Sequence, residues 1–235
     1  RVVGRARGYM LTGTLGGLLS STSVTLTFAR LSRTSPDDGR ALAAGTLGAN
    51  AMLFPRVLVA TAILAPPLAR SLWPLLLLPC AIAAALTLRG LRASGGGESH
   101  QSQENPLHLG AALQMALLFQ VVLFGVALAR WWFGERGIYA SAAVLGLADM
   151  DALTISMADL TAKGAAASVA ATAVLIGVLA NTCVKLTIAL VVGRGRFRVL
   201  TGAGLAVIGA TLVGALYVMQ AGGWLERVRA YFGGA

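Results

Sequence analysis

Long apolar segments make up most of this chain, and they restrict it to one environment. Hydrophobic residues account for 57% of the 235 residues, whereas charged residues account for only 12%. A soluble domain of this size cannot bury so much apolar surface and still present a polar surface to water. A helix crosses the hydrocarbon core with about 20 apolar residues, whereas a membrane β-barrel shows alternating segments of about ten, and the chain has none. The composition therefore predicts an all-α polytopic membrane protein in contact with the lipid bilayer.

About seven apolar segments form two halves around a polar linker. The segments are Tyr9–Ala29, Ala41–Ala65, Leu72–Leu88, Leu107–Ala129, Ile138–Met157, Ala165–Val192 and Val199–Gln220. Residues 93–106 are rich in Gly, Ser, Gln and Glu, which is typical of a flexible linker. We therefore expect a first transmembrane repeat in residues 1–92 and a second in residues 107–235.

Two stretches, one in each half, resemble each other and place polar side chains inside apolar segments. They read GLLSSTSVTLT at residues 17–27 and GLADMDALTIS at residues 146–156. At this offset of 129 residues, Ser20 lies opposite Asp149, and Thr22 lies opposite Asp151. Many membrane transporters place a substrate site between two repeats that keep polar groups at mid-membrane. The alternative is chance similarity in a chain rich in Ala, Leu and Gly.

The number of membrane crossings depends on whether these two polar stretches span the bilayer. If all seven segments cross, the flanking Arg and Lys residues are shared almost equally between the two sides, which gives no orientation signal. If Tyr9–Ala29 and Ile138–Met157 instead enter and return on the same side, one side becomes clearly more basic. The second arrangement also makes the two halves an inverted repeat. It requires broken or re-entrant helices, whose free backbone groups protein or water must satisfy. We favour this arrangement.

Asp149 and Asp151 are the strongest candidates for function. A carboxylate in the middle of an apolar segment is costly unless it is paired, hydrated or protonated. Residues two apart point in nearly opposite directions on a regular helix, so both can serve one site only if the backbone is unwound there. The alternative is that one aspartate caps a half-helix while the other faces solvent in a crevice.

Basic residues follow an asparagine in each half and are candidate charge partners. Asn181 and Lys185 lie one helical turn apart on one face, whereas Arg56 follows Asn50 by six residues with Pro55 between them. We expect Lys185 to neutralise Asp149 or Asp151. For both basic residues the alternative is that the side chain extends to the membrane surface.

The remaining candidates are the hydroxyl-bearing residues of the first half, which complete one predicted binding site. The hydroxyls of the first half either bind solute or pack as small residues against a neighbouring helix. The expected ion- or substrate-binding residues are Ser20, Ser21, Thr22, Ser23, Asn50, Asp149, Asp151 and Asn181. Carboxylate, amide and hydroxyl oxygens suit a hard cation or a proton relay, and the sequence does not identify a metal.

No enzyme motif and no cofactor motif is present. The net charge of +10 comes from basic residues beside apolar segments, so we expect no nucleic-acid partner.

The same motifs carry a family resemblance. GGLLSSTSVTLTFAR, AGTLGANAMLFPR, Asn105-Pro106-Leu107 and GLADMDALTIS followed by LANTCVK resemble the C-terminal domain of MgtC/SapB-type bacterial membrane proteins, the domain of unknown function 4010. The resemblance implies a multi-pass protein of the bacterial inner membrane and supplies no activity.

Two functions remain open from the sequence. The first is a transporter or channel-like protein that moves a small cation or polar solute through a mid-membrane site between the repeats. The second is a membrane regulator without a transport path that binds another membrane protein through small-residue faces. In either case the chain is a candidate homo-oligomer.

Overall fold

The computed structural model describes residues 5–93 and 137–221, and all regular structure in these two ranges is helical. The elements in chain order are α1 (Arg5–Thr34), the short 3-10 helix η1 (Pro36–Asp38), α2 (Gly39–Ala51), α3 (Leu53–Leu64), α4 (Pro66–Ala93), α6 (Ile138–Ala148), α7 (Met150–Ala162), α8 (Ala167–Val191) and α9 (Gly195–Gln220). The predicted segment Leu107–Ala129 and almost all of the predicted linker, with both histidines, lie outside the described residues.

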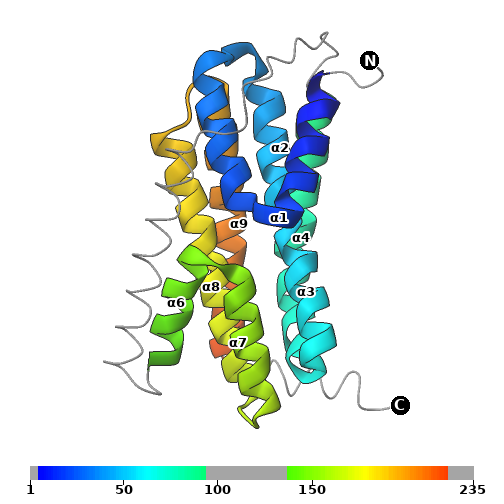
Figure 1. The fold of residues 1–235 in the computed structure, drawn as a ribbon, viewed down its shortest axis with the longest axis vertical. Coiled ribbons are helices and arrows are strands. Elements are labelled where there is room, and N and C mark those ends of the chain that lie inside the picture. Colours follow the sequence, from blue (N-terminus) through cyan, green and yellow to red (C-terminus); the bar gives the residue numbers. More distant parts are fainter. Residues whose placement is uncertain (1–4, 94–136, 222–235) are drawn as a thin grey trace.

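Four stretches of the described chain are long and apolar enough to cross a membrane. They are Pro36–Leu64, which includes α2 and α3, Pro66–Gly90 in α4, and the whole of α8 and α9. These stretches correspond to four of the expected segments, so the helical, membrane-spanning character predicted from composition agrees with the structure. The long axes of these helices run along the bundle from one end to the other (Figure 1).

The two polar stretches do not form straight spanning helices. Helix α1 descends from one end of the bundle, turns near the middle and returns to the end from which it came (Figure 1). Helices α6 and α7 form a similar hairpin that starts from the opposite end (Figure 1). Both polar stretches therefore reach only the middle of the bundle, from opposite ends, as the re-entrant arrangement predicts.

A smaller break separates α2 from α3 and has a local cause. Pro55 lies in the first turn of α3, and proline has no backbone N–H to donate to the carbonyl four residues earlier, that of Ala51. Helix α2 ends at this same residue, and Met52 lies between the two helices. This break lies between Asn50 and Arg56, two polar residues of the same span.

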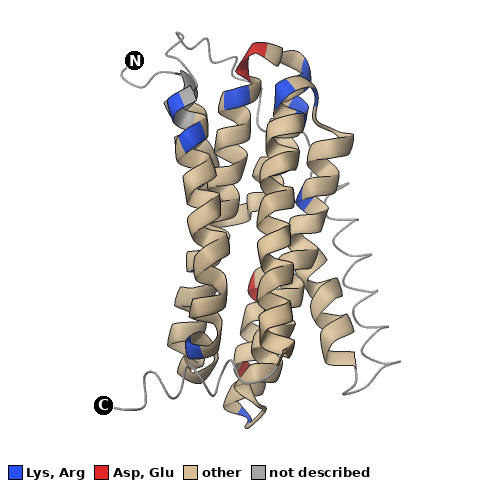
Figure 2. Ribbon diagram, turned by 180° about the vertical axis from the view of Figure 1, so that it is seen from behind, with Lys and Arg blue, Asp and Glu red and all other residues tan. Residues whose placement is uncertain are grey.

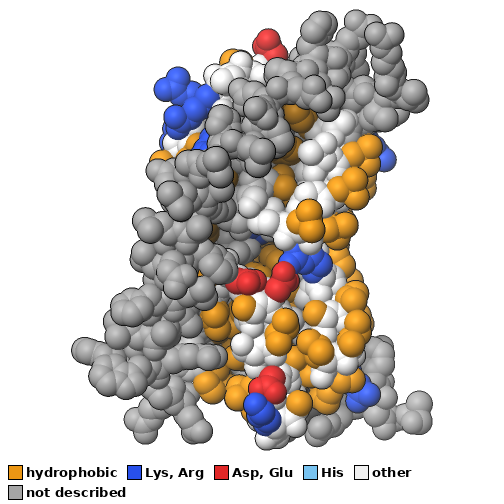
Figure 3. All heavy atoms as spheres, viewed as in Figure 1, with side chains coloured by type: hydrophobic (Ala, Val, Ile, Leu, Met, Phe, Trp, Pro, Cys, Tyr) orange, Lys and Arg blue, Asp and Glu red, His pale blue; other side chains and the backbone are white. Residues whose placement is uncertain are grey.

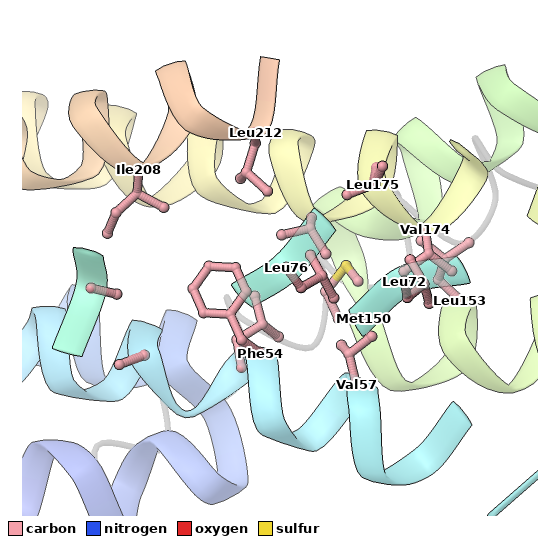
Figure 4. Packing of buried hydrophobic residues seen from close by; sticks show 14 of the residues in the cluster. Phe54, Val57, Leu72, Leu76, Met150, Leu153, Val174, Leu175, Ile208 and Leu212 are labelled. Atoms are coloured by element: carbon pink, nitrogen blue, oxygen red, sulfur yellow. The ribbon is translucent and has the colours of Figure 1, made fainter. Parts of the chain in front are cut away.

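Apolar side chains from both halves meet on either side of that centre. Phe54 and Leu76, from α3 and α4, lie close to Met150 at the start of α7, with Leu212 of α9 nearby (Figure 4). In a bilayer, apolar side chains gain little by leaving lipid, so close van der Waals packing must hold such helices together. A continuous packed core across the two halves meets that requirement.

Glycines allow the closest helix approaches. A Cβ at Gly146 in α6 would overlap the backbone of Gly177 in α8, and a Cβ at Gly17 in α1 would overlap the backbone of Ala49 in α2. Gly17 and Gly146 are aligned in the two similar stretches. In each half, therefore, the hairpin contacts the following helix backbone to backbone, just before its own break.

Most charged residues of the described chain lie at the two ends of the bundle (Figure 2). The end at which α1 begins and ends, α2 begins, α4 ends and α8 meets α9 holds most of the arginines of the described residues. They are Arg30, Arg33, Arg40, Arg89, Arg92, Arg194, Arg196 and Arg198. The opposite end carries Arg70 and Lys163. The charge difference between the ends is therefore large.

The helix contact at Gly146 gives a direct test of the packing. We expect Gly146→Ala to lower the free energy of unfolding by about 1–3 kcal/mol, because the added methyl group must push two backbones apart. Gly214→Ala in α9 is the matched control, since no atom lies within 4 Å of a Cβ at that position. Thermal unfolding in detergent measures both variants. Equal stability of the two variants would contradict the close approach of α6 and α8.

Candidate functional site

The two hairpins turn at aligned residues with the same backbone geometry. Ser20 has φ −156° and ψ 102° inside α1, and Asp149 has φ −150° and ψ 108° between α6 and α7. These are extended conformations, so each residue ends one half-helix and precedes the next. Each break leaves backbone N–H groups on one side and carbonyl groups on the other without partners from the helix itself.

The residue at each break caps the half-helix that follows it. Asp149 accepts hydrogen bonds through Oδ1 from the backbone N–H groups of Asp151 at 2.8 Å and Ala152 at 3.2 Å. Ser20 accepts one through Oγ from the N–H of Ser23 at 3.2 Å, and its hydroxyl donates to the Ser23 hydroxyl at 3.0 Å. Aspartate and serine are both preferred N-cap residues because their oxygens satisfy these free donors. Their alignment in the sequence therefore has a structural meaning.

Side chains from other helices satisfy the carbonyl ends of the same breaks. Arg56 of α3 donates through Nη1 to the carbonyls of Gly17 at 3.1 Å and Leu18 at 2.9 Å. Asn181 of α8 donates through Nδ2 to the carbonyl of Gly146 at 3.0 Å. The aligned Gly17 and Gly146 carbonyls thus receive equivalent hydrogen bonds from the spanning helix that follows each hairpin.

At the centre of the bundle, two polar side-chain contacts connect the halves directly. Arg56 forms an ion pair through Nη2 with Asp151, which is 95 residues later in the chain. Lys185 of α8 donates from Nζ to Oδ1 of Asn50 in α2 at 2.7 Å. The side chains of Arg56 and Asp151 are 21% and 56% exposed, whereas Lys185 and Asn50 are completely buried. One contact is therefore open to the surface and the other lies in the core.

The predicted pairing of Lys185 with Asp149 or Asp151 is not what the structure shows. Asp151 pairs with Arg56, Asp149 caps α7, and Lys185 instead bonds to Asn50. The alternative that Lys185 extends to the membrane surface is also excluded by its complete burial. For Asp149 the structure shows the alternative weighed above, an aspartate that caps a half-helix.

The hydroxyl-bearing residues of the first half separate into different surroundings. Ser21 is buried, Thr22 is half-buried and Ser23 is exposed. Several buried threonines elsewhere, such as Thr154, donate to the carbonyl four residues earlier in their own helix. Of the predicted set, the contacts above bring together Ser20 with Ser23, Arg56 with Asp151, and Asn50 with Lys185. The carbonyls of Gly17, Leu18 and Gly146 are further members that sequence reasoning missed.

The two buried asparagines each keep one polar atom without a partner among the described residues. These atoms are Nδ2 of Asn50, a donor, and Oδ1 of Asn181, an acceptor. Exchanging the oxygen and nitrogen of either amide does not remove the problem. It would place the Asn50 NH2 group against the Lys185 ammonium, or the Asn181 oxygen against the Gly146 carbonyl. Within the described chain, no three His, Cys, Asp or Glu side chains gather as a metal site. The centre therefore offers hydrogen-bond donors and hydrogen-bond acceptors to a ligand.

Comparison with known proteins places the chain in a family without a described activity. Residues 1–193 match the model of the domain of unknown function DUF4010, and the chain belongs to that family. It is 30% identical over 196 residues to an uncharacterized protein of Aquifex aeolicus (strain VF5), an alignment that covers 81% of this chain and 84% of the relative. No solved structure matches. These matches leave the resemblance to MgtC/SapB-type proteins as a prediction.

The cap at Asp149 can be tested without abolishing the fold. We expect Asp149→Ala to lower the free energy of unfolding by about 0.5–2 kcal/mol, because two backbone N–H groups lose their acceptor. Asp149→Asn and Asp149→Ser should retain most of the stability, since both residues can cap, and serine reproduces the first half. Asp159→Ala, at an exposed ion pair near the end of α7, is the control. Thermal unfolding in detergent measures the stability of each variant. If Asn is as damaging as Ala, the carboxylate acts through its charge and not as a cap.

The ion pair between the halves predicts a specific pattern of coupling. Arg56→Ala should destabilise more than Asp151→Ala, because arginine also donates to backbone carbonyls of α1. The double variant should deviate from additivity by about 0.5–3 kcal/mol. Lys185→Ala combined with Asp151→Ala should be additive, since those residues share no contact. Melting temperatures of the two double-mutant cycles provide the measurement. Coupling in the Lys185 cycle but not in the Arg56 cycle would reverse the assignment of partners.

Proposed function

We propose that this member of the DUF4010 family is a membrane transporter or channel-like protein, with its solute site where the two hairpins meet. The two halves would act as inverted repeats in the bacterial inner membrane. One observation carries the proposal: two helices break half-way along the bundle, from opposite ends, and ionisable side chains collect at the breaks. Broken helices at the interface of inverted repeats are a recurring way to build a transport site.

The cost of this arrangement supports a function beyond stability. Each break exposes backbone groups at a depth where lipid offers no hydrogen bonds, and each unsatisfied group would cost several kcal/mol. Continuous helices in both places would avoid that cost and would not need Arg56, Asp149 or Asn181. Ionisable residues at this depth are usually retained for an ion or solute pathway.

Access to the centre is a second support. Acidic and basic side chains lie together half-way along the molecule, on a face otherwise lined with apolar side chains (Figure 3). Asp151 is the first acidic residue of α7, and 56% of its side chain is accessible. A carboxylate left open to hydrocarbon is costly even beside an arginine. We therefore infer that this opening is hydrated or covered by protein, as a solute pathway or an oligomer interface requires.

The class of solute depends on which polar groups at the centre are not already bonded to other side chains. The sequence favours a cation because carboxylate and amide oxygens are good ligands for hard cations. The Asp151 carboxylate and the Asn50 oxygen, however, are bonded to Arg56 and Lys185. A cation would have to displace one of these side chains. We therefore widen the proposal to a small ion of either sign or a small polar solute.

The distribution of arginines orients the protein. Cytoplasmic loops carry the excess of Lys and Arg in bacterial membrane proteins. We therefore assign the arginine-rich end, with the α8–α9 connection, to the cytoplasm and the α7–α8 turn to the opposite side. In this orientation the α1 hairpin enters from the cytoplasm and the α6–α7 hairpin from outside.

The alternative, a regulator that binds another membrane protein, requires a dry centre in which the polar groups satisfy one another. Several contacts have that character, including the one between Asn181 and the Gly146 carbonyl. The exposure of Asp151 counts against it, as do the two buried amide atoms that have no partner in the described part of the chain. We therefore prefer transport, and a stable partner that copurifies with the protein would favour the regulator.

Flux measurements with matched variants test the transport proposal. The protein is reconstituted in liposomes, and the fluxes of protons, Na⁺, K⁺, Mg²⁺ and small anions are measured. We expect Asp151→Asn and Arg56→Gln to lower the active flux by about tenfold or more, which corresponds to about 1.4 kcal/mol of lost interaction. Asp159→Asn makes the same change of charge at the far end of α7 and should transport normally. If the wild-type protein moves none of these ions, or if both variants retain its flux, the proposal fails.

A further inference from the structure

The ammonium group of Lys185 lies in the core without a counter-charge among the described residues. Its side chain has no exposed surface, and its hydrogen bond goes to the neutral Oδ1 of Asn50. The two carboxylates at the centre have other roles, one in the ion pair with Arg56 and one as the cap of α7. A buried charge requires both a charge partner and hydrogen bonds for its remaining protons. An ammonium has three donors, and only one is used here.

Two further unused groups belong to the hydrogen-bond partner of Lys185 and to a residue one helical turn before it. Asn50, its hydrogen-bond partner, is completely buried and has an unused Nδ2 donor. Asn181, one helical turn before Lys185 on the same face of α8, is 4% exposed and has an unused Oδ1 acceptor. Three buried side chains thus offer several donors, a positive charge and one acceptor without a partner in the described chain.

The geometry points to a binding site for a small oxyanion formed by Lys185, Asn50 and Asn181. The anion would accept hydrogen bonds from the Lys185 ammonium and the Asn50 amide, and it would supply the missing negative charge. A protonated oxygen on the same ligand would donate to Asn181. Hydrogen carbonate has both kinds of oxygen, whereas formate and acetate have only the acceptors. This inference rests on the proposed function only in making the site part of a solute pathway; binding itself does not depend on transport.

A cation fits this site poorly. Any cation that used the Asn50 and Asn181 oxygens would lie close to a buried ammonium and would first have to displace it from Asn50. Chloride would satisfy the donors and the charge but not the Asn181 acceptor. The expected order of affinity is therefore hydrogen carbonate first, then formate and acetate, then chloride, with no effect of sodium or potassium.

The test measures the melting temperature of the full chain in detergent. The sodium salts of hydrogen carbonate, formate, acetate and chloride are titrated at fixed pH, with sodium gluconate keeping the ionic strength constant. We expect a saturable increase with the oxyanions, of about 5–10 °C at a concentration one hundred times the dissociation constant. Isothermal titration calorimetry with hydrogen carbonate gives the stoichiometry, which should be one anion per chain.

Three variants assign the effect to this site. Asn50→Asp supplies an internal counter-charge of the same shape, so it should raise the melting temperature in gluconate and abolish the response to anions. Lys185→Gln removes the charge and should weaken binding at least tenfold. Lys163→Gln changes the only other lysine of the chain, which is exposed at the end of α7, and should respond like the wild type.

The outcomes separate this inference from the transport proposal. If no anion stabilises the wild-type protein, the unused groups hold ordered water only or the amine is neutral, and the inference is wrong. It is also wrong if Asn50→Asp retains the full response, or if Lys163→Gln loses it. Saturable oxyanion binding that Asn50→Asp and Lys185→Gln both remove supports the inference, even if reconstituted protein transports nothing. Cation flux without oxyanion binding would leave the transport proposal standing and end this one.

Discussion

Half-helices that end in the middle of the bundle create backbone groups that must be satisfied there, and the centre of this molecule is organised around that requirement. Ser20 and Asp149 accept hydrogen bonds from backbone N–H groups at the breaks, while Arg56 and Asn181 donate hydrogen bonds to backbone carbonyls there. In water such groups would be solvated at little cost. In the membrane we propose, a group left without any partner would cost several kcal/mol, so these four side chains stabilise both hairpins.

Satisfying the backbone also fixes which residues meet across the halves. Arg56 must lie against the end of the first half of α1 to reach the carbonyls of Gly17 and Leu18, and its second nitrogen then reaches Asp151. Arginine suits this double task because its planar fork of donors can bind two acceptors in different directions. The ion pair therefore follows from a backbone requirement as well as from charge attraction.

The breaks could be predicted from the sequence, whereas the contacts between the halves could not. Ser20 and Asp149 stand out because polar residues rarely interrupt apolar segments, and their alignment shows that one explanation serves both. The partners of Arg56 and Lys185 lie 95 and 135 residues away in the chain. Sequence spacing reveals neighbours within one helix, which is why Lys185 is predicted to meet an aspartate and in fact meets Asn50. The choice between these partners depends on how α2 and α8 pack.

The two polar side-chain contacts that connect the halves at the centre of the bundle differ in a way that matters for movement. The Arg56–Asp151 pair is partly exposed, so water can replace its contacts at modest cost, whereas the Lys185–Asn50 bond is buried and has no replacement in the core. A ligand of millimolar affinity supplies about 4 kcal/mol, which is comparable to the cost of separating one such buried contact. A solute that bound at Lys185 could therefore offset the loss of the hydrogen bond between Lys185 and Asn50. At Arg56, water alone could replace the contacts with Asp151. The buried contact is thus the one at which solute binding would control whether the halves separate.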